Sequence, residues 1–463
     1  MPCTPLSQDP EPDWANEEFG KAELGDARRS KRLVMLARQL ARSPHCSFPQ
    51  SLSACELKAA YRFFDNDGVD TDGILTAHIG QTLTRMHAVP LVLAVQDTTE
   101  YNLTHLSATE GLGYCSHKKV RGFFMHSMLA LTPDGLPLGV LGLKTWVRPL
   151  EQLGKRNLRK TLPIQNKESA KWIEGLNQVT ALQSRCPQTH IVSVCDREAD
   201  VYDLFVAERA AGVDWLVRAA WNRGVDHPEK YLWEAMQSIP AMGTTTLRVP
   251  ARGSTPERTA RLTIRCAPVR IRAPRNRQGQ GLAEVEVYAT WAIETAPPEG
   301  VDPIEWMLLS SVPTQTLEQA LERLSWYARR WTIETWHRVL KSGCQIEARQ
   351  FGDAQRFMRA TALFAVIGWR ILYATLLGRL DADLSCEVLL QRFEWQALYC
   401  RTHATTHPPK QPPTLGKAIL WIAKLGGYLG RTRDRPPGIT VLWRGFLSLH
   451  ESSQMYLIFR KNE

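Results

Sequence analysis

Several kinds of chemistry are excluded by what this chain lacks. Its 463 residues include ten cysteines, but no two of them form a Cys-x-x-Cys pair. This spacing argues against a zinc ribbon or a disulfide framework. The chain also has no Walker A loop, no His-Glu-x-x-His motif and no Gly-x-Ser-x-Gly motif. P-loop ATP hydrolysis, zinc-dependent peptidase activity and serine hydrolase activity are therefore not expected.

Membrane segments and export signals are also lacking. The opening Met1-Pro-Cys-Thr-Pro5 has no basic and apolar signal-peptide pattern. The most apolar stretch, Thr361 to Leu377, is interrupted by Arg370 and is short for a span of ~20 residues. We interpret it as a buried helix. The sequence predicts a soluble, cytoplasmic protein in a reducing compartment, with no membrane association.

Acidic residues are the scarcer charge. The chain has 47 of them against 57 lysines and arginines, which gives a net charge of +10 and a pI near 9.1. A basic balance of this kind favours a polyanionic partner such as nucleic acid. Many soluble proteins are equally basic, so charge alone leaves this question open.

Apolar patterns divide the chain into helical ends around a mixed α/β centre. A charged, amphipathic helix is expected from Glu17 to Leu40, within a basic helical unit that either places a helix against DNA or covers a larger domain. Short buried strands, such as Leu91 to Val95, then alternate with helices, which indicates a mixed sheet. Between Arg248 and Arg277 the β-rich sequence has nine arginines and one acid, which predicts an insertion with a positive surface. The predicted segments are a helical domain (1–80), an α/β core in two parts (81–222 and 305–374), the β-rich insertion (223–304) and a helical C-terminal domain (375–463).

One stretch combines acid, base and apolar residues in helical spacing. If Trp326 to Lys341 forms a single helix, Tyr327, Arg330, Glu334 and Lys341 fall in one stripe roughly 60° wide. The opposite side is apolar and suited to burial; it comprises Ile333, Trp336, Val339 and Leu340. A carboxylate on the polar stripe can hold a hard metal ion, and the cations beside it can hold phosphates.

Two further carboxylates follow apolar strands. Asp97 is expected to end the strand that begins at Leu91, and Asp196 the strand Ile191 to Cys195. A lone Asp in such a place is more often a turn former or a helix cap. Together with Glu334, however, the two would form a site of three mutually repelling carboxylates. Two Mg²⁺ or Mn²⁺ ions would relieve that repulsion and can activate water against a phosphodiester.

The chain resembles the insertion-sequence-four family of bacterial DDE transposases, those like the transposase of transposon five. The family's Y-R-E-K signature is intact, with two residues between Tyr327 and Arg330, three between Arg330 and Glu334, and six between Glu334 and Lys341. Similarity covers nearly the whole chain in order. The other matching stretches are Leu24-Gly-Asp-Ala-Arg-Arg29, Ala60-Tyr-Arg-Phe63, Gln96-Asp-Thr-Thr99, Cys195-Asp-Arg-Glu-Ala-Asp200, Trp306-Met-Leu-Leu-Ser310 and Leu425-Gly-Gly427.

This resemblance implies a ribonuclease-H-like core interrupted by the β-rich insertion. It implies a cut-and-paste transposase that cuts transposon ends through a hairpin intermediate, joins them to target DNA and works as a homodimer. Asp97, Asp196 and Glu334 would be the metal-binding triad. The DNA-binding residues that the resemblance implies are Tyr327, Arg330, Lys341, Trp306, Arg29, Arg32, Arg62 and Arg218, with Trp306 stacking on a flipped base.

Other interpretations remain open at this point. Trp306 also suits a core position on a strand, and any single arginine also suits the surface. The family places further basic residues after Arg218, whereas here Ala219, Ala220 and Trp221 follow. An apolar face near Ile419 fits either a dimer interface or packing within the monomer. Alternative functions are a nuclease without strand transfer, a ribonuclease acting on RNA–DNA hybrids and a non-catalytic DNA-binding regulator.

Overall fold

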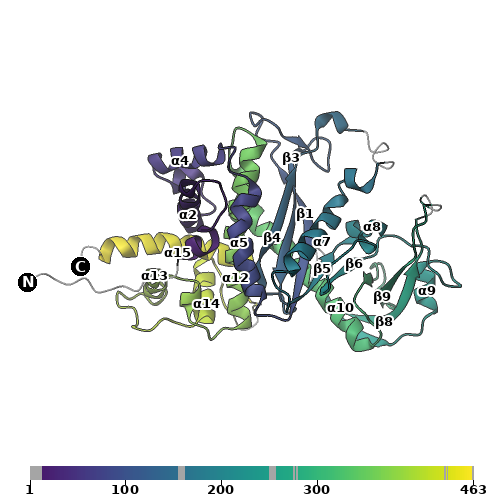
Figure 1. Ribbon diagram of the computed structural model, residues 1–463. Helices are drawn as coiled ribbons and strands as arrows, with labels where there is room; N and C mark the ends of the chain where they lie inside the picture. The colour runs from purple at the N-terminus through teal and green to yellow at the C-terminus, as the bar shows by residue number, and fades with distance from the viewer. Residues whose placement is uncertain are drawn as a thin grey trace, which may run out of the picture.

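The computed structural model shows a mixed sheet with helices on both faces and a helical region at one end (Figure 1). It describes residues 13–154, 162–249, 257–274, 277, 280–431, 434 and 436–460. The helices of the N-terminal and C-terminal regions lie together, although they are far apart in the sequence (Figure 1). Mixed α/β architecture with helical ends agrees with the expectation from the sequence.

Ten strands form the sheet, in the order β2-β3-β1-β5-β6-β10-β9-β8-β7, with β4 paired to β3. Strands β1, β5 and β6 run parallel to one another, and the remaining neighbours are antiparallel. The strands are β1 (Leu91–Asn102), β2 (Gly113–Tyr114), β3 (Arg121–Leu131), β4 (Pro137–Trp146), β5 (His190–Cys195), β6 (Val213–Arg218), β7 (Gly243–Val249), β8 (Arg258–Ile271), β9 (Val285–Glu294) and β10 (Glu305–Ser310).

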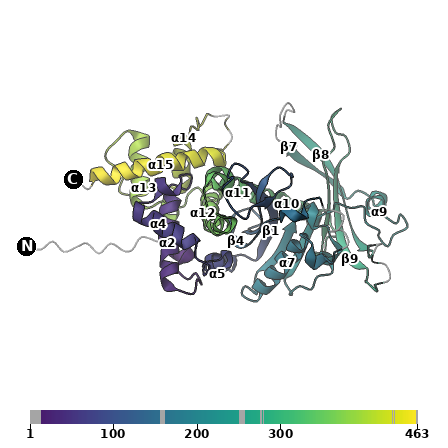
Figure 2. The same cartoon turned by 90° about the horizontal axis from the view of Figure 1, so that it is seen from above.

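The central strands are apolar on both sides because both faces of the sheet are covered. Leu93 and Val95 of β1 belong to the core shared with α11 (Trp331–Arg338) and α12 (Ala354–Leu380). Val92 and Ala94 point the other way, into the core under α7 (Ala170–Gln183), α8 (Tyr202–Phe205) and α9 (Leu232–Ser238). Figure 2 shows α11 and α12 on one side of β1 and α7 on the other.

The prediction that the first buried strand ends at Asp97 is wrong. Strand β1 continues to Asn102 because β3 pairs with it along that whole length, and Asp97 lies opposite Ser127. The prediction for the second carboxylate is confirmed: β5 ends at Cys195, and Asp196 caps the short turn of 3₁₀ helix that follows.

The β-rich insertion is part of the same sheet. Strand β9 pairs with β10, so β7, β8 and β9 extend the core sheet at its far edge (Figure 1). The expected positive surface stays a prediction, although most of the described arginines between Arg248 and Arg277 are paired with acids. The ion pairs are Arg248–Glu257, Arg258–Glu294, Arg270–Glu286, Arg272–Asp226, Arg272–Glu284 and Arg277–Asp203. Arg252 and Arg275 lie outside the described residues.

From residue 13 on, where the described part of the chain begins, the N-terminal region has five helices. The single helix expected from Glu17 to Leu40 is wrong, because the chain turns at Gly25, which has φ +70°, and Asp26 caps a new helix by accepting from the Arg28 N–H. A positive φ at this point favours glycine. The helices are α1 (Trp14–Phe19), α2 (Ala27–Arg42), α3 (Phe48–Ser51), α4 (Ala54–Phe64) and α5 (Thr71–Met86).

The C-terminal region is built on α12. Its 27 residues are apolar enough, by length and composition, to cross a membrane, but 78% of its most apolar window is buried within the protein. The predicted buried helix is thus confirmed. Ile419 and Ile422 are buried in the core of this region, so they pack within the monomer. The other helices are α13 (Arg392–His403), α14 (Leu415–Leu425) and α15 (Ile439–Arg460). The segment boundaries predicted at 80/81 and 374/375 fall inside α5 and α12.

A buried polar cluster joins the N-terminal helices to the sheet. Glu18 of α1 accepts hydrogen bonds from His78 and Arg85 of α5, with 2.7 Å between Arg85 Nη1 and Glu18 Oε1. The other ring nitrogen of His78 accepts from the Val140 N–H of β4 at 2.9 Å. Both Glu18 and His78 are buried, so each depends on its partners to replace the water it has lost.

Removing this carboxylate is expected to destabilise the protein. Glu18→Ala leaves His78 and Arg85 without their acceptor, which should lower the free energy of unfolding by roughly 3–5 kcal/mol. Chemical denaturation followed by circular dichroism measures the change. Glu17→Ala, at the exposed neighbouring position, is the matched control and should have little effect. Equal stability of the two variants would contradict the assignment.

Candidate active site

Residues 326–341, for which a polar face and an opposite apolar face were predicted, form parts of two helices and a turn. Helix α10 (Leu317–Arg329) ends where the Arg330 N–H donates to the Tyr327 carbonyl, and α11 starts at Trp331. A π-helical segment, Val339–Gly343, follows. The prediction of one continuous helix is therefore wrong. Arg330 itself keeps right-handed helical backbone angles, with φ −51° and ψ −31°.

The buried face of this segment is confirmed. The four predicted residues are all buried, and the Trp336 indole Nε1–H donates to the Ala365 carbonyl of α12 at 3.1 Å. This contact holds α11 between α12 and the sheet. Glu334 lies on the side of α11 that faces the carboxylates of the central strands. The predicted apolar residues are Ile333, Trp336, Val339 and Leu340.

Asp97 and Asp196 come from neighbouring parallel strands. Strands β1 and β5 pair with Val95 beside Val194, so the two aspartates lie two residues further along on strands about 4.8 Å apart. Both side chains are largely buried, with Asp97 13% exposed. The three carboxylates predicted from the sequence therefore lie near one another, close enough for the charges of Asp196 and Glu334 to raise the pKa of Asp97.

Burial and mutual repulsion change the acidity of these groups. Burial, with the charges of Asp196 and Glu334, raises the pKa of Asp97 to about 7, although the positive charge of Arg330 acts in the opposite direction. Burial also raises the pKa of Asp196. Perturbation by desolvation plus specific charge partners is typical of a functional site.

Arg330 provides the positive charge among these acids. Its Nη1 lies 3.6 Å from Asp97 Oδ1, and its Nη2 donates to Glu334 Oε1. The guanidinium is 14% exposed. Within the described ranges, no three His, Cys, Asp or Glu side chains come close enough together to hold a metal ion. The donors fit a hard cation chemically, because all three are carboxylates, but Arg330 contacts two of them in this structure.

Other predicted DNA-binding residues lie on both sides of Arg330. Tyr327 is buried, packs edge to face on Trp306 with 5.3 Å between ring centroids, and has its pKa raised by burial. Arg218 donates to the Glu305 carbonyl at 2.8 Å, next to Trp306. Lys341 lies on the far side, with Nζ 5.6 Å from the ring centre of Tyr101. The structure thus brings Tyr327, Trp306 and Arg218 together and places Lys341 beyond Glu334.

The arginines predicted in the N-terminal region do not meet the carboxylates. They lie on α2 and α4, which pack against the side of α12 away from the sheet (Figure 2). Arg29 donates to the carbonyls of Leu24 and Gly68, so it holds a local turn together. Arg32 is partly exposed, and Arg62 is exposed at the end of α4. Their role in binding DNA stays a prediction.

His337 was not singled out by the sequence. It is buried against Asp97, with Nδ1 3.7 Å from Asp97 Oδ2 and Nε2 2.8 Å from Ser127 Oγ of β3. Burial, with the charges of Lys341 and Arg330, lowers its pKa to about 3, so the ring is neutral near pH 7. The sequence could have indicated His337 only through its position three residues after Glu334, which places both side chains on the same side of one helix.

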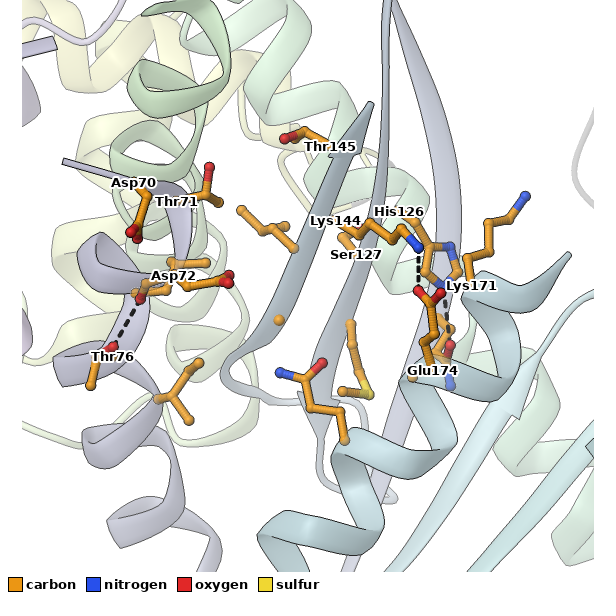
Figure 3. A pocket seen from close by; sticks show the side chains of 18 residues that line it. Asp70, Thr71, Asp72, Thr76, His126, Ser127, Lys144, Thr145, Lys171 and Glu174 are labelled. Carbon is orange, nitrogen blue, oxygen red and sulfur yellow. Dashed lines mark hydrogen bonds and ion pairs between the residues drawn. The ribbon is translucent and has the colours of Figure 1, made fainter. Parts of the chain in front are cut away.

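A separate cavity lies on the opposite face of the sheet. It has a volume of about 560 Å³ and lies between α5, β4 and α7, as Figure 3 shows. Lys144, Lys171, Glu174 and His126 line it, and Lys144 is paired with Glu174. None of the three predicted carboxylates lines this cavity. Its mixed charges do not select a ligand, so it is a poorer candidate for the functional site.

The raised pKa of Asp97 predicts a stability change with pH. An unfolded Asp has a pKa near 3.9, so between about pH 4 and 7 the folded protein retains a proton that the unfolded chain releases. The wild-type protein should therefore lose stability as pH rises through this window in the presence of EDTA. Asp97→Asn removes that loss. The free energy of unfolding of Asp97→Asn minus that of wild type should therefore be roughly 2–4 kcal/mol larger at pH 8 than at pH 4, and the variant should be the more stable protein at pH 8.

Chemical denaturation at both pH values measures this difference. Asp134→Asn, in the exposed turn between β3 and β4, is the control and should follow the wild-type pH dependence. Parallel stability curves for wild-type and Asp97→Asn protein would show that Asp97 is not a destabilised buried acid.

Family comparisons agree with the two helical regions. Residues 11–69 match the family model described as Transposase DNA-binding. Residues 366–454 match the model described as Transposase Tn5 dimerisation domain. The two matches lie at opposite ends of the chain, in the order that the sequence motifs predicted. Together they support a Tn5-like transposase of the insertion-sequence-four family.

Proposed function

We propose that this protein is a cut-and-paste DNA transposase whose reacting centre comprises Asp97, Asp196 and Glu334. The observation that carries the proposal is the mutual electrostatic influence of these carboxylates from β1, the end of β5 and α11, where the charges of Asp196 and Glu334 raise the pKa of Asp97. The matches to transposase DNA-binding and dimerisation models support a DNA substrate and a homodimer.

The strand order supports a ribonuclease-H-like core. Strands β4, β3 and β1 form an antiparallel meander, and β5 and β6 then add parallel to β1 on its other edge. Right-handed crossovers through helices are the rule for such parallel additions. In this arrangement the first carboxylate lies on the central strand, and the second follows the strand beside it, which matches Asp97 and Asp196.

The carboxylates fit a divalent cation by donor type. Asp97, Asp196 and Glu334 would hold Mg²⁺ or Mn²⁺, with two ions expected by resemblance to the family. When bound, such ions activate water and stabilise the leaving oxygen of a phosphodiester. Water would cut one DNA strand and leave a 3′-hydroxyl on the transposon end. That hydroxyl would attack the phosphodiester of the opposite strand, form a hairpin on the transposon end and release the 3′-oxygen of the flanking DNA. Hairpin opening and joining to target DNA complete the reaction.

Cationic and aromatic side chains around the carboxylates suit a DNA strand. Arg330 and Lys341 flank Glu334, at distances of four and seven residues, and would hold phosphates on either side of the cut. Trp306 is partly exposed beside Tyr327 and Arg218 and would stack on an unpaired base. Stacking of this kind contributes roughly 1–3 kcal/mol per base, enough to offset part of the unstacking cost.

Substitution of the triad tests the catalytic assignment. Asp97→Asn, Asp196→Asn and Glu334→Gln should each abolish Mg²⁺-dependent cleavage of a duplex that carries the inverted repeats flanking the coding region. Binding of the same duplex should persist, because the N-terminal region is untouched. Glu198→Gln, an exposed acid two residues after Asp196, is the control and should still cleave.

Normal cleavage by any triad variant would remove that residue from the centre. Products in which transposon ends are joined to target DNA distinguish a transposase from a nuclease without strand transfer. Absence of cleavage by the wild-type protein with Mg²⁺ would favour a non-catalytic regulator.

Lys341 offers a second test, on DNA binding. Lys341→Ala should weaken binding of that duplex whatever its base sequence, because a phosphate contact does not read bases. It should also reduce the salt dependence of binding by about one counterion, because one phosphate contact is lost. A filter-binding titration over several salt concentrations measures both effects. Lys410→Ala, exposed in the loop before α14, is the control. An unchanged salt slope would contradict a phosphate contact at Lys341.

A further inference from the structure

The position of Arg330 conflicts with simultaneous metal binding at the proposed centre. Its guanidinium approaches Asp97 and donates a hydrogen bond to Glu334, so it occupies oxygen atoms that a metal ion would need. Mg²⁺ requires oxygens at about 2.0–2.1 Å in a nearly octahedral arrangement. A positive guanidinium among those oxygens competes for the same lone pairs and repels the incoming cation.

The carboxylates need a counter-charge whether or not metal is present. Three acids in a partly buried site repel one another strongly, and the only cation in contact with both Asp97 and Glu334 among the described residues is Arg330. Its position at the break between α10 and α11 lets the side chain reach β1 and α11 together. The cation stays buried there because the ion pairs compensate its desolvation.

We propose that Arg330 and the metal ions use the same carboxylate site in turn. In the metal-free protein Arg330 holds Asp97 and Glu334 close together. Metal binding displaces its guanidinium and so frees it to bind a DNA phosphate. This inference rests on the proposed function, since it assumes that the carboxylates bind metal. Metal binding and phosphate binding then favour each other. Metal takes the carboxylates from Arg330, a phosphate takes Arg330 from the carboxylates, and either event breaks the same ion pairs.

Mn²⁺ titration of the full-length protein without DNA tests the exchange. Isothermal titration calorimetry at about pH 8 keeps Asp97 mostly ionised. Arg330→Gln removes the competing charge and should bind Mn²⁺ about tenfold more tightly than wild type, the factor expected when a hydrogen bond between charged groups no longer has to be broken. Arg330→Ala should change affinity in the same direction.

Arg329→Gln is the matched control. It removes the same unit charge from the adjacent residue, but Arg329 donates to the Pro133 carbonyl at 3.0 Å and not to a carboxylate. Mn²⁺ affinity that rises only for the Arg330 variants supports the exchange. An equal rise in Arg329→Gln would reduce the effect to general electrostatics and overturn the inference. Weaker binding by Arg330→Gln would overturn it as well, since Arg330 would then support the metal site.

A thermal-unfolding measurement covers the case in which the variants are unstable. If metal takes over the role of Arg330, saturating Mn²⁺ should raise the unfolding temperature of Arg330→Gln more than that of wild type. A variant that remains unfolded in Mn²⁺ would sink the inference. The proposed function is tested separately by Glu334→Gln, which should lose Mn²⁺ affinity. If it does not, the metal site itself is wrong, whatever Arg330 does.

Discussion

The concentration of negative charge beside strand β1 is the constraint on which the rest of this structure depends. Asp97, Asp196 and Glu334 are held in a partly buried site, where water cannot fully stabilise them, and burial moves the pKa of Asp97 to about 7. Such an arrangement persists only if the surrounding packing is strong enough to offset its cost. Two features supply that strength: the parallel pairing of β1 with β5, and the attachment of α11 to α12 through Trp336. Arg330 then limits the repulsion from within the site.

Helix α12 connects this site to the regions that match DNA-binding and dimerisation models. It packs against α2 and α4 on one side, against α11 and the sheet on another, and against α14 and α15 towards the C-terminus. Glu18, His78 and Arg85 add a second connection from the N-terminal helices to β4. The proposed function combines DNA binding, pairing with a second copy and phosphodiester cleavage, and it needs these regions in fixed relative positions. The buried, apolar α12 provides much of that rigidity, and its Arg356 and Arg359 form ion pairs with Asp65 and Asp67 of the N-terminal region.

Part of the candidate site was predictable from the order of residues. Asp196 follows a buried strand, and the spacing of Glu334 from Ile333, Trp336, Val339 and Leu340 separates an apolar face from a polar one. These are local properties, because strand burial and helical periodicity depend on residues close in the chain. The same reasoning failed where a distant partner decides the outcome. Strand β1 extends past Asp97 because β3 pairs with it, and Arg277 of the insertion is paired with Asp203, which lies in an earlier segment of the chain.

The sequence by itself therefore determined which residues carry the charges, which faces are apolar and in what order the motifs occur. Only the tertiary structure decided that Arg330 contacts both Asp97 and Glu334, that His337 lies against Asp97, and that Tyr327 is buried beside Trp306. The physical reason is that these contacts depend on the break between α10 and α11 and on the docking of α11 between α12 and β1. This docking joins Trp336 of α11 to Ala365 of α12 and His337 of α11 to Ser127 of β3. The second contact spans 210 residues of sequence, and no local pattern encodes it.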